Sequence, residues 1–264
     1  MDILNSSAAE YVLTLDCPET RGLVHAVSGF LLEQGCDILE SKQFDSQDDG
    51  HFFMRIHFAS AGDPAGDSPG GPATLDSLRE AFVPVAEKFG MQWQLRAHGT
   101  KRRVLIMVSK FEHCLNDLLF RARIGELPID IVGVVSNHPD HRGIVEWHGI
   151  PFFHVPVTAD TKPAAEESLM ELVDRLDVEL VVLARYMQVL SDDLTRRLDG
   201  RAINIHHSFL PSFKGAKPYH QAHARGVKTV GATAHYVNAE LDEGPIISQQ
   251  VVEVHSVQAT AVAH

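Results

Sequence analysis

At 264 residues the chain is long enough for two domains that each bury a core, and its 44% apolar and 22% charged residues are typical of globular proteins. The formal net charge of −12 argues against binding to a nucleic-acid backbone, which needs clustered lysines and arginines. Three scattered cysteines, no secretory signal and no apolar run of membrane-spanning length predict a cytoplasmic protein that contacts neither nucleic acid nor membrane.

The first 97 residues predict the order strand, helix, strand, strand, helix, strand. Apolar and polar residues alternate at 11–15 and 91–95, while apolar residues recur at helical spacing over 24–31 and 75–89. Strands over 38–44 and 51–58 flank Asp49-Gly50, a strong hairpin signal, and the Gly/Pro-rich residues 61–73 predict a loop. This βαββαβ order is that of the ferredoxin-like fold.

Residues 16–22 (Asp-Cys-Pro-Glu-Thr-Arg-Gly) stand in the first turn of this half. With the order of elements, they resemble the ACT domain family, which implies a regulatory or oligomerisation role for residues 1–97. Domains of that family pair edge to edge and often bind an amino acid between them. The resemblance therefore implies a homo-oligomer with an amino-acid effector, although the pattern does not separate a ligand-binding example from a purely oligomeric one.

After a linker over 97–102, strands alternate with helices through residues 103–264, which predicts a Rossmann-like, mostly parallel α/β domain. Near-continuous apolar runs predict strands covered on both faces at 104–108, 129–136, 152–155, 180–183, 202–205 and 229–236. Helical spacing marks 115–124 and 162–176, and a last apolar run covers 246–254. Because the helical tail usual in such domains is missing after that run, we expect the domain to be C-terminally incomplete.

Residues suited to acid–base chemistry follow the last two of these strands. Asn204 and His206 stand at the end of the strand over 202–205, and Asp242 lies in the loop after the strand over 229–236. Ligands of open α/β sheets bind outside the carboxyl ends of the strands, so we expect the three side chains to converge there. A donating amide, an imidazole that carries a proton and a carboxylate suit acyl or formyl chemistry.

The pattern around these residues resembles the catalytic signature of the folate-dependent formyltransferase family. The matching positions are Asn204, Ile205, His206, Ser208, Leu210, Pro211, Phe213 and Gly215, then Asp242, Gly244, Ile246 and Ile247. Residues 183–190 resemble the pterin-contacting segment of that family. The doublet His206-His207 and the string Pro-Tyr-His-Gln-Ala at 218–222 resemble one branch, the 10-formyltetrahydrofolate deformylases.

The resemblance implies hydrolysis of 10-formyltetrahydrofolate to formate and tetrahydrofolate, with no cofactor and no metal. In that role the enzyme would balance the one-carbon folate pool and supply formate for purine biosynthesis. Asn204 and protonated His206 would stabilise the oxyanion, and Asp242 would support His206 and activate water. The implied substrate-binding residues are Met187, Gln188, Val189, Leu190, His207, Gly215, His235 and Gly244. For His207 and His235, packing is an equally good interpretation, and the two glycines also permit tight turns.

Residues 109–114 (Ser-Lys-Phe-Glu-His-Cys) follow the first strand of the second half. The branch that formylates glycinamide ribonucleotide has a glycine-rich turn there, whose backbone N–H groups hold the acceptor's phosphate. In this chain the stretch has no glycine, and Glu112 would repel a phosphate. Water is therefore the expected acceptor of the formyl group.

Three alternatives stay open at the level of sequence. The chain could transfer the formyl group to an amine, or it could be an inert regulatory protein that binds an amino acid. A metallohydrolase is suggested by sixteen histidines and by residues 138–141 (His-Pro-Asp-His). Against it, the sequence lacks a His-Glu-x-x-His pair, and a third ligand has no obvious candidate.

Overall fold

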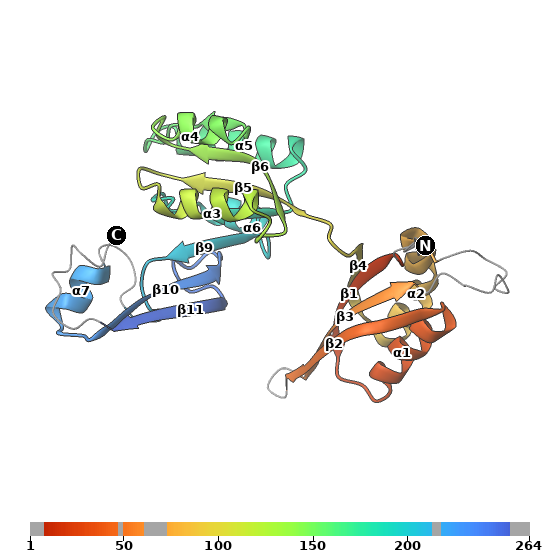
Figure 1. The fold of residues 1–264 in the computed structure, drawn as a ribbon. Coiled ribbons are helices and arrows are strands. Elements are labelled where there is room, and N and C mark those ends of the chain that lie inside the picture. The colour runs from red at the N-terminus through yellow and green to blue at the C-terminus, as the bar shows by residue number, and fades with distance from the viewer. Residues whose placement is uncertain (1–7, 47–49, 61–72, 213–217, 254–264) are drawn as a thin grey trace, which may run out of the picture. The chain divides into compact units, whose positions relative to one another are not determined.

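The computed structural model describes residues 8–46, 50–60, 73–212 and 218–253, and the chain forms two compact units, Met1–Thr100 and Lys101–His264 (Figure 1). The boundary falls inside the predicted linker over 97–102. Among the described residues, none of the helices combines the length and the apolar character needed to span a bilayer.

The first unit has the βαββαβ order of the ferredoxin-like fold. Its elements are β1 (Glu10–Pro18), α1 (Leu23–Glu33), β2 (Cys36–Ser46), β3 (His51–Ser60), α2 (Leu75–Phe89) and β4 (Gln92–Ala97). The sheet order is β2-β3-β1-β4, and neighbouring strands are antiparallel. This topology does not by itself identify an ACT domain, so that assignment stays a prediction.

Local sequence accounts for these elements. Thr74 and Ser77 form a reciprocal capping box at the start of α2, and Gly90 ends that helix at a φ of 62°. Alternate residues of β3 are buried against the helices, as predicted: Phe52, Met54, Ile56 and Phe58. Gly50 has the positive φ expected for the hairpin, whereas Asp49 and residues 61–72 of the predicted loop lie outside the described residues.

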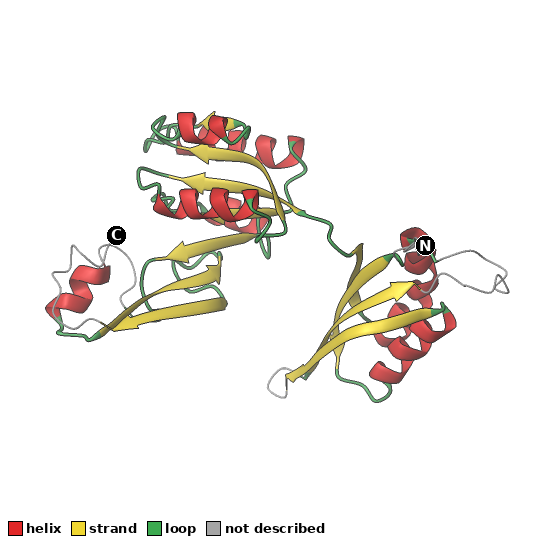
Figure 2. Cartoon of the chain, viewed as in Figure 1, coloured by secondary structure: helices red, strands yellow, loops and turns green. Residues whose placement is uncertain are grey.

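The second unit is an α/β domain around a seven-stranded, mostly parallel sheet, with helices on both faces (Figure 2). Its strands are β5 (Arg102–Val108), β6 (Ile129–Ser136), β7 (Phe152–His154), β8 (Leu180–Leu183), β9 (Ala202–His206), β10 (Thr229–Tyr236) and β11 (Ile246–Glu253). Its helices are α3 (His113–Arg123), α4 (Arg142–Trp147), α5 (Lys162–Arg175), α6 (Asp192–Arg197) and α7 (Pro218–Ala224).

Two hydrophobic cores lie on opposite faces of this sheet and divide the residues of β5 between them. Leu105 and Met107 pack in the core that includes α5 and α6, and Val104, Ile106 and Val108 pack in the core that includes α3 and α4. All five are at most 1% exposed. This burial on both faces explains the continuous apolar run in the sequence.

The direction of β10 corrects one step of the sequence argument. The sheet order is β11-β10-β9-β8-β5-β6-β7, in which β5 to β9 are parallel but β10 is antiparallel to both β9 and β11. The carboxyl ends of β9 and β10 therefore do not meet at one edge of the sheet. Asp242 reaches the end of β9 through the return loop between β10 and β11 instead.

Candidate active site

The candidate site is built on the last residues of β9. Asn204 and His206 alternate along the strand, so both side chains project from the same face of the sheet. In the antiparallel register with β10, His235 lies opposite Asn204, and Thr233 lies opposite His206. The strand register thus brings His235 to the site, although it is 31 residues from Asn204 in sequence.

The loop between β10 and β11 carries Asp242 in a conformation held by close backbone packing. Asp242 itself has a φ of 59°, a left-handed conformation that is uncommon for a residue with a side chain. A Cβ built on Gly244 would clash with the carbonyl oxygen of Tyr236, so only glycine fits where the loop passes β10. The tight crossing fixes the path of the chain on either side of it.

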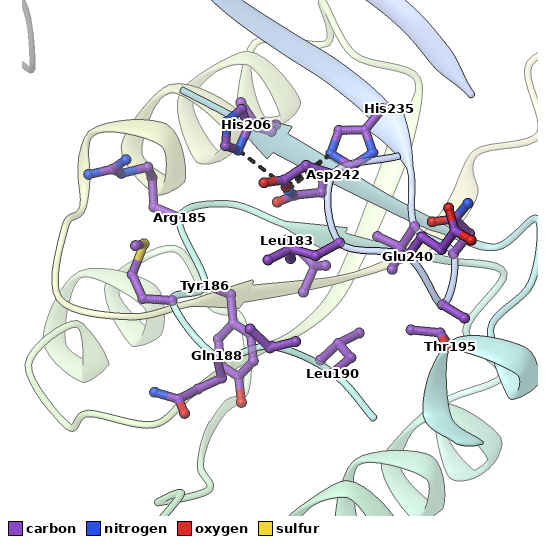
Figure 3. A pocket seen from close by; sticks show the side chains of 18 of the residues that line it. Leu183, Arg185, Tyr186, Gln188, Leu190, Thr195, His206, His235, Glu240 and Asp242 are labelled. Carbon is purple, nitrogen blue, oxygen red and sulfur yellow. Dashed lines mark hydrogen bonds and ion pairs between the residues drawn. The ribbon is translucent and has the colours of Figure 1, made fainter. Parts of the chain in front are cut away.

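One carboxylate joins the two histidines. Oδ1 of Asp242 lies 3.3 Å from Nδ1 of His206 and 3.8 Å from Nε2 of His235, and Figure 3 shows Asp242 between the two rings. His206, His235 and Asp242 are 5%, 2% and 8% exposed. Because the three groups are almost fully shielded from water, their electrostatic interactions are stronger than the same contacts at the surface.

Hydrogen bonds fix the orientation of Asn204 and His235. Nδ1 of His235 lies 2.8 Å from the carbonyl oxygen of Tyr236, which can only accept, so Nδ1 carries the proton. In the neutral ring Nε2 is then an acceptor, and it lies 3.2 Å from Nδ2 of Asn204. The Asn204 amide therefore donates one N–H to His235 and retains the other for a ligand.

His206 has one nitrogen engaged and one available. Its Nδ1 faces Asp242, whereas its buried Nε2 has no hydrogen-bond partner among the described residues. A buried nitrogen without a partner is costly, which is a common signature of a group that meets a ligand. His206 and Asn204 both line a cavity of about 350 Å³. Nε2 of His206 and the remaining N–H of the Asn204 amide are therefore placed to bind a substrate.

The cavity has one mainly apolar wall after β8 and one wall from the loop after β10 (Figure 3). The first wall consists of Leu183 and residues 185–190, and the second of residues 237–242. Burial raises the pKa of Tyr186 to about 12, with a contribution from Glu166, so this phenol stays neutral. A mainly apolar wall opposite a few convergent polar groups is typical of sites for small organic ligands.

The "Formyl transferase" family model matches residues 102–263. A formyltetrahydrofolate deformylase of Corynebacterium sp. strain P-1 is 64% identical over 249 residues, which covers 94% of this chain and 84% of the relative. The formyltetrahydrofolate deformylase of Escherichia coli K12 is 39% identical over 243 residues, which covers 92% of this chain and 82% of that relative. The chain belongs to the formyltetrahydrofolate deformylase family. Members of this family are hydrolases, so the chain is an enzyme.

Solved structures agree with this assignment. A formyltetrahydrofolate deformylase from Burkholderia mallei superposes with a TM-score of 0.89 at 51% identity, covering 97% of this chain and 88% of that one. A phosphoribosylglycinamide formyltransferase from Anaplasma phagocytophilum gives a TM-score of 0.56 at 36% identity, covering 62% of this chain and 78% of the other. The deformylase likeness therefore extends over both units.

Most of the binding residues predicted from sequence line the cavity: Met187, Gln188, Val189, Leu190, His207 and His235. Gly244 does not line it and acts through the backbone, while Gly215 lies outside the described residues. His207 is half-buried, 5.9 Å from Tyr219 between ring centroids. Burial, followed by the nearby cations Arg185 and His206, lowers the pKa of His207 to about 4, so its ring is neutral.

Sequence reasoning missed several lining residues, above all Arg185, Asn238 and Glu240. The two polar residues of the β10–β11 loop carry no spacing signal. Arg185 lies within residues 183–190, which resemble the pterin-contacting segment of the family, but it was not predicted as a binding residue.

The turn over residues 109–114 supports the cavity wall. Ser109 is 2% exposed, and its hydroxyl accepts from the backbone N–H of Met187 at 2.9 Å and donates to Oδ1 of Asn137 at 2.7 Å. Through the Ser109 hydroxyl, residues 109–114 are thus hydrogen-bonded to the segment 187–190 that is expected to contact the pterin.

Among the described residues, the side chains grouped closely enough to share a metal ion are Glu10, His57 and His98. They belong to the first unit, whereas the cavity belongs to the second. His141, from the sequence motif that suggested a metallohydrolase, instead bonds the carbonyl oxygen of Ser109 through Nε2 at 2.8 Å. That bond gives the buried His141 a structural role.

Proposed function

We propose that this member of the family hydrolyses 10-formyltetrahydrofolate to formate and tetrahydrofolate. The observation that carries the proposal is the group formed at the cavity by the half-buried Asn204 and the buried His206, His235 and Asp242. The pterin would lie against residues 187–190, and the formyl group would lie between the Asn204 amide and Nε2 of His206.

The groups present account for each step. Water attacks the formyl carbon, and the carbonyl π electrons move to oxygen, where the Asn204 N–H and a protonated His206 stabilise the charge. Loss of one such donor typically costs roughly 10²–10³ in rate. Asp242 orients the water and takes its proton. The oxyanion then re-forms the C=O bond as the C–N10 bond breaks, N10 takes a proton from His206, and the proton held by Asp242 returns to His206. Formic acid then loses its remaining acidic proton to give formate.

The proposal is tested by incubating the protein with 10-formyltetrahydrofolate and no amine, then measuring formate and tetrahydrofolate. We expect the two products to appear in equal amounts. Addition of glycinamide ribonucleotide should neither raise the rate nor yield a formylated product, because residues 109–114 offer side chains where a phosphate needs backbone N–H groups. Formyl groups recovered on the added amine would support a transferase instead.

We further propose that the first unit is an ACT domain that mediates homo-oligomerisation and takes an amino-acid effector. Its βαββαβ topology and its residues 16–22 support this role. We also propose that the enzyme acts in the cytoplasm, without a metal or cofactor, to balance the folate pool and supply formate for purine biosynthesis. Support for this last point comes from the family resemblance.

A further inference from the structure

Arg185 is a cation in the cavity wall that the proposed hydrolysis does not use. It is the second residue after the end of β8 and has a φ of 62°, which is rare for a residue with a side chain. Its guanidinium is stacked over the ring of Phe111, with Cζ 5.1 Å from the ring centroid. Such stacking holds the charged plane in one orientation.

The guanidinium lacks an anionic partner among the described residues. Its Nε is buried without a hydrogen bond, and burial lowers the pKa of Arg185. The titratable groups that act on it are Cys114 and Tyr219, and burial raises the pKa of both, so both are neutral near pH 7. A partly desolvated cation without a counter-ion is costly, which makes this place favourable for an anion.

Arg185 lies near the reacting groups. Both Arg185 and His206 lower the pKa of His207, and Asp242 acts on the same ring in the opposite direction. Arg185, His206, His207 and Asp242 all line the one cavity. The guanidinium of Arg185, His206 and Asp242 therefore all lie close enough to His207 to act on its charge.

We propose that Arg185 forms a carboxylate subsite that receives formate when the C–N10 bond has broken. The inference rests on the proposed hydrolysis. Formate is the one small anion that the reaction creates, and it forms beside the carboxylate of Asp242, which repels it. A guanidinium binds a carboxylate through two parallel N–H donors, so Arg185 offers the product a favourable position away from Asp242.

The test compares product inhibition by sodium formate in the full-length enzyme and in Arg185→Met and Arg185→Lys. We expect the inhibition constant for formate to rise at least about tenfold in Arg185→Met, since a bidentate charged contact is lost. Arg185→Lys keeps the charge but loses the two parallel donors, so its inhibition constant should lie between those of the wild type and Arg185→Met. Arg142→Met is the control, because Arg142 also stacks on a ring, Phe152 at 5.0 Å, but does not line the cavity.

A second comparison decides whether Arg185 binds formate or the carboxylates of the folate's glutamate tail. Substrate with and without its glutamate is compared in the wild type and in Arg185→Met. If the variant raises KM only for the glutamate-bearing folate and leaves formate inhibition unchanged, Arg185 holds the tail, and the proposal is overturned.

A direct binding measurement separates this inference from the proposed hydrolysis. The NMR line width of ¹³C-formate is measured with each protein in the absence of substrate, so the result does not depend on turnover. Broadening in the wild type that is lost in Arg185→Met, with circular dichroism unchanged, supports the subsite even if turnover fails. Equal broadening in both proteins overturns it even if the enzyme is active.

Discussion

Asp242 joins the polar groups of the site, because a single oxygen faces both His206 and His235. Asp242→Asn keeps the shape of the side chain but removes the charge that supports a protonated His206 and accepts the proton of water. We expect turnover to fall by at least ~10²-fold, with folate binding largely kept, as for the loss of a general acid–base group. Steady-state kinetics together with folate binding measured by fluorescence would check this.

Glu240→Gln is the matched control for that substitution. Glu240 also lines the cavity, but it is exposed. Removal of its charge should leave turnover within about threefold of the wild type. If Asp242→Asn kept more than half of the activity, the assigned role of Asp242 would be wrong.

The half-buried ring of His207 should make the fold sensitive to acid. Its pKa of about 4 lies below the ordinary value of 6.5, so between these values the unfolded chain binds a proton that the folded chain does not. The free energy of unfolding therefore falls as the pH decreases through this window. Between pH 7.5 and pH 5, we expect His207 to contribute a loss of about 1 kcal/mol.

Urea unfolding at the two pH values would measure this contribution. His207→Gln should lose less stability on acidification than the wild type, while His220→Gln, at an exposed position of α7, should behave as the wild type does. Equal acid sensitivity in His207→Gln and the wild type would contradict the assignment.

Asn204, His206 and Asp242 could be predicted as site residues because their residue types and motif suit formyl chemistry. The structure brings the three side chains together at one cavity. Their catalytic roles stay predictions. The sequence alone could not pair His235 with Asn204, since that contact depends on the register of two strands. Nor could it give the neighbours of Arg185, since Phe111, Cys114 and Tyr219 are distant from it in sequence.

The loop between β10 and β11 is the element that positions Asp242, and Gly244 is its tightest point. A methyl group in Gly244→Ala would meet the carbonyl oxygen of Tyr236, a backbone atom that cannot move aside alone. The loop would have to shift and take Asp242 with it. We expect activity to fall by more than about tenfold and unfolding to become easier by about 1–3 kcal/mol, as for other overpacked sites.

Gly143→Ala provides the comparison within the same unit. Gly143 lies in α4, and a Cβ there would meet no atom within 4 Å outside its own helix and its chain neighbours, so the substitution should be neutral or slightly stabilising. Kinetics and thermal melting of both variants would check the expectation. Similar behaviour of the two variants would show that the close approach at Gly244 does not position Asp242.

The elements differ in how far sequence could predict them. The bounds of α2, β6, β8 and β10 agree with the prediction, because long periodic segments and buried apolar runs are strong signals. The helices α4, α6 and α7 have only six or seven residues, too few for a helical period to stand out, and we did not predict them. The antiparallel direction of β10 was also missed, since burial patterns do not encode strand direction.

At the scale of the whole molecule, each unit has its own hydrophobic core. A second unit with its own cores should fold without the first. In the first unit β2 is an edge strand, and its residues 37–45 are exposed. A long unpaired edge offers backbone N–H and C=O groups to another chain, which is the physical reason to expect edge-to-edge pairing between subunits.

Deletion of residues 1–97 should therefore lower the oligomeric state without unfolding the remaining chain. Light scattering would give the number of subunits, and circular dichroism would verify that the shortened chain keeps its α/β fold. Any effect of an added amino acid on the rate of formate release should vanish with the first unit. A shortened chain with the same number of subunits as the full chain would place the interface in the second unit, and the pairing role proposed for the ferredoxin-like unit would have to be abandoned.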